Sequence, residues 1–244
     1  MLKVLVVGNG AREHALVWKL SQSPKIAEIY AAPGNAGIAS TASILNIKPT
    51  DITGLAAAAR EHKIDLTGVG PEVPLAQGIV DFFESRGLRI FGPSKAAARI
   101  EASKVFSKEL MQKYGIPCAK SESFTSFQAA KSYVKKGPCP IVLKADGLAA
   151  GKGVIIANTT DEALTALSDI MERRAFGDAG TSVVVEECLI GKEVSLLAFT
   201  DGTTVVPMVP ACDYKRVGDG DAGLNTGGMG SYSPPGFFGP DMVA

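Results

Sequence analysis

The sequence predicts an α/β protein that begins with a Rossmann-like parallel sheet, continues with a smaller α+β lobe and ends with the beginning of a larger lobe. Three observations lead to this prediction. In the first third of the chain, continuous apolar runs alternate with amphipathic stretches, a pattern typical of a parallel sheet covered on both faces. Glycine-rich turns follow most of these runs. After about residue 100, short paired strands and helices surround a glycine-rich tip.

Five apolar runs are expected to form the parallel sheet, with helices in the intervals between them. The expected strands are Leu2–Val7, Glu28–Ala32, Ile44–Ile47, Ile64–Val69 and Leu88–Phe91, and the expected helices are the stretch carrying Ala15, Leu16 and Leu20, then Ile52–His62 and Leu75–Ser85. The turns that follow parallel strands lie at one edge of a sheet, where ligands bind. The turns Gly8–Glu13, Pro33–Gly37, Gly70–Glu72 and Gly92–Ser94 therefore indicate a site.

The rest of the chain is expected to open with one long helix, Ser94–Tyr114, which Gly115 and Pro117 end. Two capping-box spacings, Thr125 with Gln128 and Thr159 with Glu162, predict two further helices. Two strand pairs with these helices make the small lobe, and an Asp-Gly turn then joins two more strands. The expected strands are Pro140–Ala145, Val154–Ala157, Ser182–Glu187, Glu193–Thr200 and Thr203–Val209.

Composition excludes several classes of protein. The 244 residues carry 25 basic and 25 acidic side chains, so neither nucleic acid nor a membrane surface is expected as a partner. Cys118, Cys139, Cys188 and Cys212 are widely spaced, which favours a reduced, cytoplasmic setting over a zinc ribbon or a disulfide scaffold. The apolar start is short and is interpreted as a strand rather than a signal peptide.

The first turn, Gly8–Glu13, follows a strand and opens a helix, so a dinucleotide-binding fold is the first alternative. Two details argue against it. Glu13 stands at the third glycine of GxGxxG, and the second strand ends in Ala31-Ala32-Pro33, without a carboxylate for a ribose hydroxyl. Backbone N–H groups of this turn and the Arg12 guanidinium are suited to a phosphate. A tight turn without a ligand is the other interpretation.

The loop Asp146–Gly153 resembles a P-loop but differs from it, because three residues rather than four separate its first two glycines and Gly153 follows the lysine. The loop joins two strands. A glycine-rich tip of this kind folds over a triphosphate, to which Lys144 and Lys152 would supply two cations. The alternative is a mobile surface hairpin with solvated lysines.

Two later segments carry polar groups suited to ligands. The strand Val183–Glu187 ends in acid, and its backbone together with Glu193 is suited to an adenosine, although acidic strand ends are commonly just solvated. Asp213–Arg216 and Asn225–Gly230 combine charge with a glycine pair, which suits an anionic substrate; a charged loop and a linker are the alternative. His14 and His62 have no partner at metal or triad spacing, so no metal site is predicted and nothing supports hydrolase chemistry.

Taken together, these segments resemble one family over essentially the whole chain. The motifs GNGAREHALVWKL, APGNAGIA, VGPEVPLAQGIVD, FGPS, LKADGLAAGKGVI, VEE and NTGGMG occur in the order and spacing of the glycinamide ribonucleotide synthetase family, a member of the ATP-grasp superfamily. Four positions depart from the family pattern: Ala11 replaces a glycine, Cys212 a glutamine, Tyr214 a histidine and Leu224 a proline. Tyr214 puts one polar substrate contact in doubt.

The resemblance implies a pre-ATP-grasp domain over 1–100, a linker helix and ATP-grasp small lobe over 101–189, and the start of the large lobe over 190–244. It implies three groups of site residues. ATP would contact Lys104, Lys144, Gly147, Gly151, Lys152, Gly153, Glu186, Glu187, Leu189 and Glu193. The substrates would contact Asn9, Gly10, Arg12, Glu13, Pro33, Gly34, Asn35, Gly70, Pro71, Glu72, Asp213, Lys215, Arg216, Asn225, Gly227, Gly228 and Met229. Lys144, Lys152 and Arg216 would act in catalysis.

The implied reaction joins glycine to 5-phosphoribosylamine through glycyl phosphate, with consumption of ATP, in purine biosynthesis. The resemblance also implies Mg²⁺ (or Mn²⁺), with ligands expected beyond Ala244, and further purine-pathway domains occur in relatives. An ATP-binding module without turnover and a nicotinamide-dependent oxidoreductase are the alternative hypotheses. We expect Lys144→Ala to lower turnover far more than stability, because the lysine would lie in a solvent-facing cleft.

Overall fold

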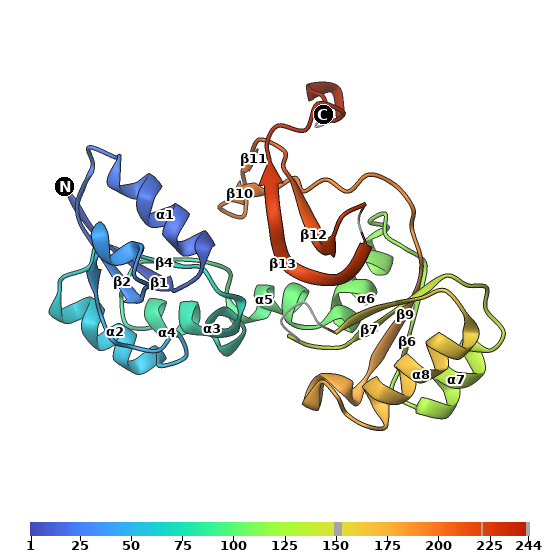
Figure 1. Cartoon of the computed structure of the whole chain (residues 1–244). Helices are drawn as coiled ribbons and strands as arrows, with labels where there is room; N and C mark the ends of the chain where they lie inside the picture. Colours follow the sequence, from blue (N-terminus) through green and yellow to red (C-terminus); the bar gives the residue numbers. More distant parts are fainter. Residues whose placement is uncertain (149–152, 221, 243–244) are drawn as a thin grey trace. The chain divides into compact units, whose positions relative to one another are not determined.

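The computed structural model describes residues 1–148, 153–220 and 222–242, and it divides into two compact units, Met1–Ile116 and Pro117–Ala244. Figure 1 labels the elements of both units. No helix within the described ranges is long and apolar enough to span a membrane. The predicted α/β class, with a parallel sheet followed by antiparallel sheets, is confirmed.

The first unit is built on a five-stranded parallel sheet in the order β3-β2-β1-β4-β5. Its strands are β1 (Leu2–Gly8), β2 (Ile26–Pro33), β3 (Ser43–Ile44), β4 (Leu66–Val69) and β5 (Ile90–Phe91). Its helices are α1 (Ala11–Ser21), η1 (Ile38–Ser40), α2 (Ile52–Glu61), α3 (Glu72–Gln77), α4 (Ile79–Glu84), α5 (Lys95–Ala102) and α6 (Lys104–Tyr114).

Strand β1 is buried on both faces, and this burial explains its continuous apolar sequence. Val4 and Val6 pack with Val17 of α1 on one face, whereas Leu5 and Val7 pack with α2 and α4 on the other. Alternate residues of a strand point to opposite faces, so a strand covered by helices on both sides needs apolar residues at every position.

Two expected helices are each divided in the structure. The stretch Leu75–Ser85 breaks at Gly78, whose φ of +94° lies in the left-handed region that glycine adopts without strain. The stretch Ser94–Tyr114 breaks at Ser103, which is extended and whose Oγ accepts a hydrogen bond from the Phe106 N–H (3.1 Å), so it starts a new helix. The expected end at Gly115 is confirmed, with φ +64°.

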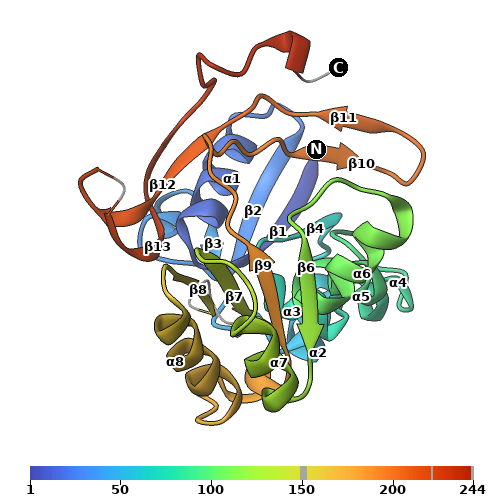
Figure 2. The same ribbon diagram turned by 90° about the vertical axis from the view of Figure 1, so that its right-hand side faces the viewer.

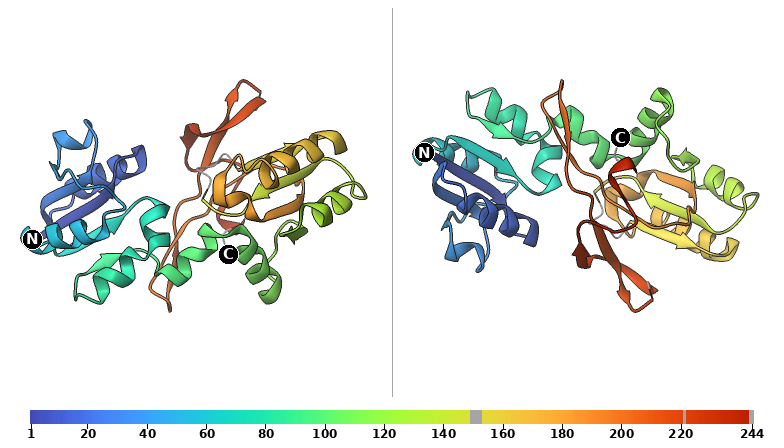
Figure 3. Two further views of the ribbon diagram at one scale, coloured as in Figure 1. Left: turned by 90° about the horizontal axis from the view of Figure 1, so that it is seen from below. Right: turned by 90° about the horizontal axis from the view of Figure 1, so that it is seen from above.

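The second unit contains a four-stranded sheet in the order β6-β9-β7-β8, and all three of its strand pairs are antiparallel. Helices α7 and α8 cover one face of it (Figures 2 and 3). The strands are β6 (Ser121–Phe124), β7 (Ile141–Ala145), β8 (Val154–Ala157) and β9 (Val183–Glu187), and the helices are α7 (Phe127–Val134), α8 (Thr160–Met171) and η2 (Gly177–Thr181). The predicted hairpin with a glycine-rich tip is β7–β8.

Of the two helix caps predicted for this lobe, one is confirmed and the other lies at a neighbouring residue. Thr159 caps α8 as expected, accepting a hydrogen bond from the Glu162 N–H, while the Glu162 carboxylate accepts one from the Asn158 N–H. For α7, the capping box at Thr125 is wrong: Ser126 is the cap and accepts from the Ala129 N–H.

Two hairpins and a short helical turn complete the unit: β10 (Ala198–Thr200) with β11 (Val205–Pro207), β12 (Cys212–Gly218) with β13 (Ala222–Tyr232), and η3 (Pro240–Met242). The first hairpin turns at Asp201 and Gly202 as predicted, but both strands are shorter than expected. The second hairpin contradicts the alternative in which Asp213–Arg216 and Asn225–Gly230 form a charged loop and a linker, because both segments lie on its strands.

Candidate functional site

Three turns meet at the carboxyl edge of the parallel sheet, as its topology predicts. Strands β2 and β4 flank β1, so the turns that follow these three strands are neighbours. The Gly34 N–H donates to the Gly8 carbonyl (3.1 Å), and the Gly70 N–H donates to the Val7 carbonyl (3.0 Å). Asn35 adds a side-chain link, because its Nδ2 donates to the Asn9 carbonyl (2.9 Å). The turns therefore form one continuous surface.

The first turn of α1 lies against all three of these turns. The Glu13 carboxylate is 6% exposed and accepts a hydrogen bond from the Gly10 N–H (2.6 Å). The His14 ring lies so close to Gly37 that a Cβ there would meet it at 2.4 Å. Arg12 is exposed. The Gly10 N–H, which the sequence suggested for a phosphate, is thus occupied by a carboxylate of the protein.

The other predicted substrate residues of this unit lie on the same turns. Gly34 and Gly70 are half-buried, as are three residues beside them. These are Pro33, Pro71 and Glu72.

In the second unit, Lys144 of β7 and Glu186 of β9 form an ion pair with an Nζ–Oε2 distance of 2.8 Å. The residues that precede them in their strands, Leu143 and Val185, belong to the core beneath α7 and α8. Because alternate residues of a strand point to opposite faces, Lys144 and Glu186 point to the other face of the sheet. The Glu186 side chain is 5% exposed and that of Lys144 is 28% exposed. The structure therefore joins a residue expected at the phosphates to one expected at the adenosine.

The glycine-rich loop begins and ends in firm backbone contacts. The Ala145 N–H donates to the Gly153 carbonyl (2.8 Å), and the Asp146 N–H donates to the Ser182 carbonyl (3.1 Å). Gly147 has φ +133°, which a side chain would disfavour. Gly151 and Lys152 lie outside the described residues. Lys144 is thus located at the base of this loop, one residue before its first anchor.

The acidic end of β9 is arranged differently from Glu186. The Glu187 carboxylate accepts a hydrogen bond from the Lys120 N–H (2.8 Å), and the Glu187 N–H donates to the Lys120 carbonyl (3.0 Å). Glu187 thus extends the pairing between β9 and the residue before β6. Leu189 follows with 69% of its surface exposed.

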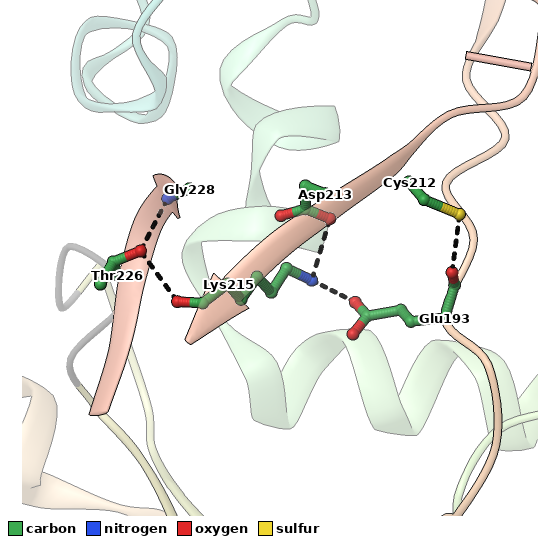
Figure 4. Close-up of polar contacts among 6 residues, drawn as sticks. All are labelled: Glu193, Cys212, Asp213, Lys215, Thr226 and Gly228. Atoms are coloured by element: carbon green, nitrogen blue, oxygen red, sulfur yellow. Dashed lines mark hydrogen bonds and ion pairs between the residues drawn. The ribbon is translucent and has the colours of Figure 1, made fainter. Parts of the chain in front are cut away.

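A second cluster of charge lies beside the β12–β13 hairpin (Figure 4). The Lys215 Nζ forms an ion pair with the Glu193 carboxylate and lies 3.9 Å from Asp213 Oδ1. The hydrogen bond to Glu193 raises the pKa of Lys215 above its ordinary value, against an opposing effect of partial burial. The Cys212 thiol donates to the Glu193 carbonyl (3.0 Å). Glu193 is therefore held by β12 through both its backbone and its side chain.

The hairpin itself carries the remaining predicted substrate residues. Arg216 and Met229 line a cavity of about 500 Å³ together with the turn of the hairpin. Arg216 pairs with Asn225 in the strand register, although the side chain of Asn225 lies outside the described part. Gly227 and Gly228 are on β13. Thr226, within the predicted segment Asn225–Gly230, donates to the Lys215 carbonyl (2.8 Å) and accepts from the Gly228 N–H (3.0 Å).

Lys104 belongs to the first unit, at the start of α6, so it is described apart from Lys144. No three His, Cys, Asp or Glu side chains cluster as metal ligands among the residues that the structure describes. A lysine at the base of a glycine-rich hairpin loop fits the phosphates of a nucleotide, because a cation and backbone N–H groups are what polyphosphates require.

The antiparallel sheet with its glycine-rich hairpin, preceded by a parallel sheet, is the arrangement of the ATP-grasp class. Residues 102–244 match the description "Phosphoribosylglycinamide synthetase, ATP-grasp (A) domain", and residues 2–101 match "Phosphoribosylglycinamide synthetase, N domain". The chain belongs to the phosphoribosylglycinamide synthetase family, which confirms the resemblance found in the sequence.

Curated relatives are similar over nearly the whole chain. A phosphoribosylamine–glycine ligase of Halalkalibacterium halodurans is 55% identical over 233 residues, covering 96% of this chain and 54% of the relative. That of a Nostoc species is 53% identical over 245 residues, covering 100% of this chain and 57% of the relative. The chain thus spans about half the length of these relatives.

Solved structures agree with this assignment. The phosphoribosylamine–glycine ligase of Thermotoga maritima superposes with a TM-score of 0.80 at 33% identity, over 94% of this chain and 55% of that one. The biotin carboxylase domain of a Hydrogenobacter thermophilus 2-oxoglutarate carboxylase, solved with MgADP, gives a TM-score of 0.68 at 20% identity, over 88% of this chain and 51% of that one. The second likeness shows the fold alone.

Proposed function

We propose that the chain carries the nucleotide-binding and part of the substrate-binding machinery of an ATP-dependent ligase that joins glycine to 5-phosphoribosylamine, a step of purine biosynthesis. In the first step, the glycine carboxylate attacks the γ-phosphorus of ATP, giving glycyl phosphate and ADP. In the second, the amine of phosphoribosylamine attacks the acyl carbon, phosphate leaves and the amine loses a proton. The products are glycinamide ribonucleotide, ADP and phosphate.

The division of labour follows the three predicted regions, 1–100, 101–189 and 190–244. The turns at the carboxyl edge of the parallel sheet bind phosphoribosylamine. Lys144 and the loop 146–153 bind the ATP phosphates, and Glu186, the backbone near Leu189 and Glu193 hold the adenosine. The β12–β13 hairpin faces substrate through Asp213, Lys215 and Arg216. In reactions of this kind the protein positions reactants and neutralises charge.

A divalent cation (Mg²⁺ or Mn²⁺) would neutralise charge on the ATP phosphates. The described residues hold no cluster of three metal-ligating side chains, so no step of this proposal is assigned to a metal ligand. Lys144 is the group on which the phosphate assignment depends. Closure of the loop over the acyl phosphate would exclude the water that otherwise hydrolyses it.

The observation that carries the proposal is the Lys144–Glu186 pair at the base of the glycine-rich loop. A lysine on the face opposite the helices has a partly exposed ammonium, and it lies one residue from the loop that a triphosphate would contact. The same conclusion is supported by the match of the chain to both the N domain and the ATP-grasp domain of one ligase family.

The direct test is ADP release by the 244-residue chain with magnesium ATP, with glycine and phosphoribosylamine omitted in turn. Release that requires both substrates would establish ligation. ATP binding without release would leave this chain as the nucleotide-binding part of the enzyme. A chain that neither binds ATP nor releases ADP would contradict the proposal.

A further inference from the structure

Glu13 is a charged residue in an interior position. It lies in the first turn of α1, and its side chain occupies the space between the turn after β1 and the turn after β4. Its Oε2 accepts a hydrogen bond from the Gly10 N–H at 2.6 Å. Burial of a carboxylate costs free energy unless hydrogen bonds and favourable dipoles offset it. The N-terminus of α1 supplies both, because its N–H groups and its dipole favour a negative charge there.

Three glycines surround this carboxylate, and each lacks a side chain where Glu13 needs space. A Cβ at Gly70 would lie 2.0 Å from Oε1 and 2.5 Å from both Cδ and Cγ. At Gly8 it would lie 2.5 Å from Cγ, and at Gly10 2.9 Å from Oε2. The glycines come from two different turns, so Glu13 fills a space that both turns define.

The position of Glu13 explains its place in the sequence. In a dinucleotide fold, the third glycine of the fingerprint lets the helix approach the strand closely. Here the glutamate stands at that point, and the glycine that makes room is Gly70, in the turn after the neighbouring strand β4. The carboxylate also occupies the helix N-terminus, where a pyrophosphate would otherwise bind.

We propose that Glu13 is a positioning residue that fixes the turns after β1 and β4 relative to each other, so that Gly8–Gly10 and Gly70–Glu72 present one rigid surface to phosphoribosylamine. This inference rests on the proposed function. Glu13 acts through the two turns and does not contact the substrate. The surface is then set by the pair of Glu13 and Gly70, and position 70 has no room for a side chain while Glu13 is native.

The first test of this pairing requires no enzyme activity. Gly70→Ala in the 244-residue chain should lower the melting temperature by about 5 °C or more, because the new methyl group overlaps Glu13. Glu13 has little room to move away, since Gly8 and Gly10 confine it on its other sides. In a Glu13→Ala background the same substitution should cost little, because the overlapping atoms are gone.

Gly68→Ala is the matched control, since Gly68 lies on β4 two residues before Gly70 and a Cβ there meets nothing within 4 Å. It should leave the melting temperature within about 2 °C of the parent in both backgrounds. An equal cost of Gly70→Ala with and without Glu13 would overturn the pairing.

The second test separates positioning from general stability. In the natural full-length protein, Glu13→Ala should raise KM for phosphoribosylamine about tenfold or more, the usual scale for loss of a charged hydrogen bond, while KM for ATP stays within about twofold. Glu13→Gln, which keeps an acceptor for the Gly10 N–H, should restore most of the affinity. Equal effects on both KM values, or none on that for phosphoribosylamine, would refute the positioning role.

A negative result in one test does not imply a negative result in the other. If the protein showed no ligase activity with native Glu13, the proposed function would be wrong, yet the melting experiment would still decide whether Glu13 and Gly70 are coupled. If ligation were present and the melting effects were additive, only the inference about Glu13 would be wrong.

Discussion

Replacement of Lys144 by methionine tests the ion pair and the phosphate assignment together. The substitution keeps most of the volume and removes the charge, leaving Glu186, whose side chain is 5% exposed, without this cation. At an N–O distance of 2.8 Å, the gross attraction is about 6 kcal/mol for an effective dielectric constant of about 20. Desolvation of both groups offsets a large part of that gain.

We therefore expect Lys144→Met to lower the free energy of unfolding by about 2–3 kcal/mol, less than for a fully buried pair because the lysine is partly exposed. For a unit of this size, the melting temperature should decrease by roughly 6–15 °C. This revises the expectation drawn from the sequence, in which loss of Lys144 mainly affected turnover. The structure predicts that stability decreases as well.

The double variant Lys144→Met/Glu186→Gln separates the two roles of the lysine. Removing both charges should recover most of the lost stability, because no carboxylate is left in the interior without its cation. ATP affinity, measured by calorimetry, should stay at least about tenfold below that of the native chain. Lys136→Met, at an exposed lysine of the same unit, is the control for charge removal.

Two results would refute this reasoning. A melting temperature of Lys144→Met within about 2 °C of the native value would mean that the pair contributes nothing to stability. Native ATP affinity in the double variant would mean that the phosphates bind elsewhere.

Three further outcomes are expected. ATP should raise the melting temperature of the chain and NAD should not, because stabilisation grows with the logarithm of ligand concentration over Kd; equal shifts would favour a dinucleotide site. Hydrogen bonds from Thr204 and Thr203 lower the pKa of Asp201 to about 2, so they stabilise the β10–β11 turn above about pH 4, and this contribution is lost as the pH falls toward 2. Amide exchange of the hairpin should follow that titration, and Asp201→Asn should abolish it. Ser103→Ala should cost about 1 kcal/mol through loss of the α6 cap, and an unchanged melting temperature would contradict this.

The parallel sheet was predictable because its signal is local. Each strand is a run of mostly apolar residues, and each turn is marked by glycine or proline, so the strands and their parallel direction could be predicted from the sequence. The meeting of the turns at one edge followed from the parallel topology. Hydrogen bonds between the turns at Gly8, Gly34 and Gly70 agree with that expectation.

Three features of the fold carry little signal in the sequence and were missed. Strand β6 has the sequence Ser-Glu-Ser-Phe, which carries little apolar signal; it forms because it pairs with the buried strand β9. The β12–β13 hairpin is rich in charge and glycine, and its pairing depends on contacts across the hairpin. The break at Ser103 was hidden because the residues on both sides are good helix formers.

Candidate site residues can be named from the sequence, whereas the contacts between them cannot. Lys144 and Glu186 are 42 residues apart in sequence, and only the register of β7 against β9 brings them to one face. The burial of Glu13 has a similar cause, since the space it fills is created by a glycine in the turn after another strand. Sequence spacing within one segment carries no information about either contact.

The contacts among the three turns also determine how this edge of the sheet unfolds locally. Asn9, Glu13 and His14 lie within one short stretch. Glu13 packs against Gly70 in the turn after β4, whereas Asn9 and His14 contact Asn35 and Gly37 in the turn after β2. Unwinding the segment from Asn9 through the first turn of α1 would release all of these contacts in one event. In native-state hydrogen exchange, the amides of Gly10, Gly34 and Gly70 should therefore exchange with a common opening free energy, as a single cooperative unit distinct from the centre of the sheet.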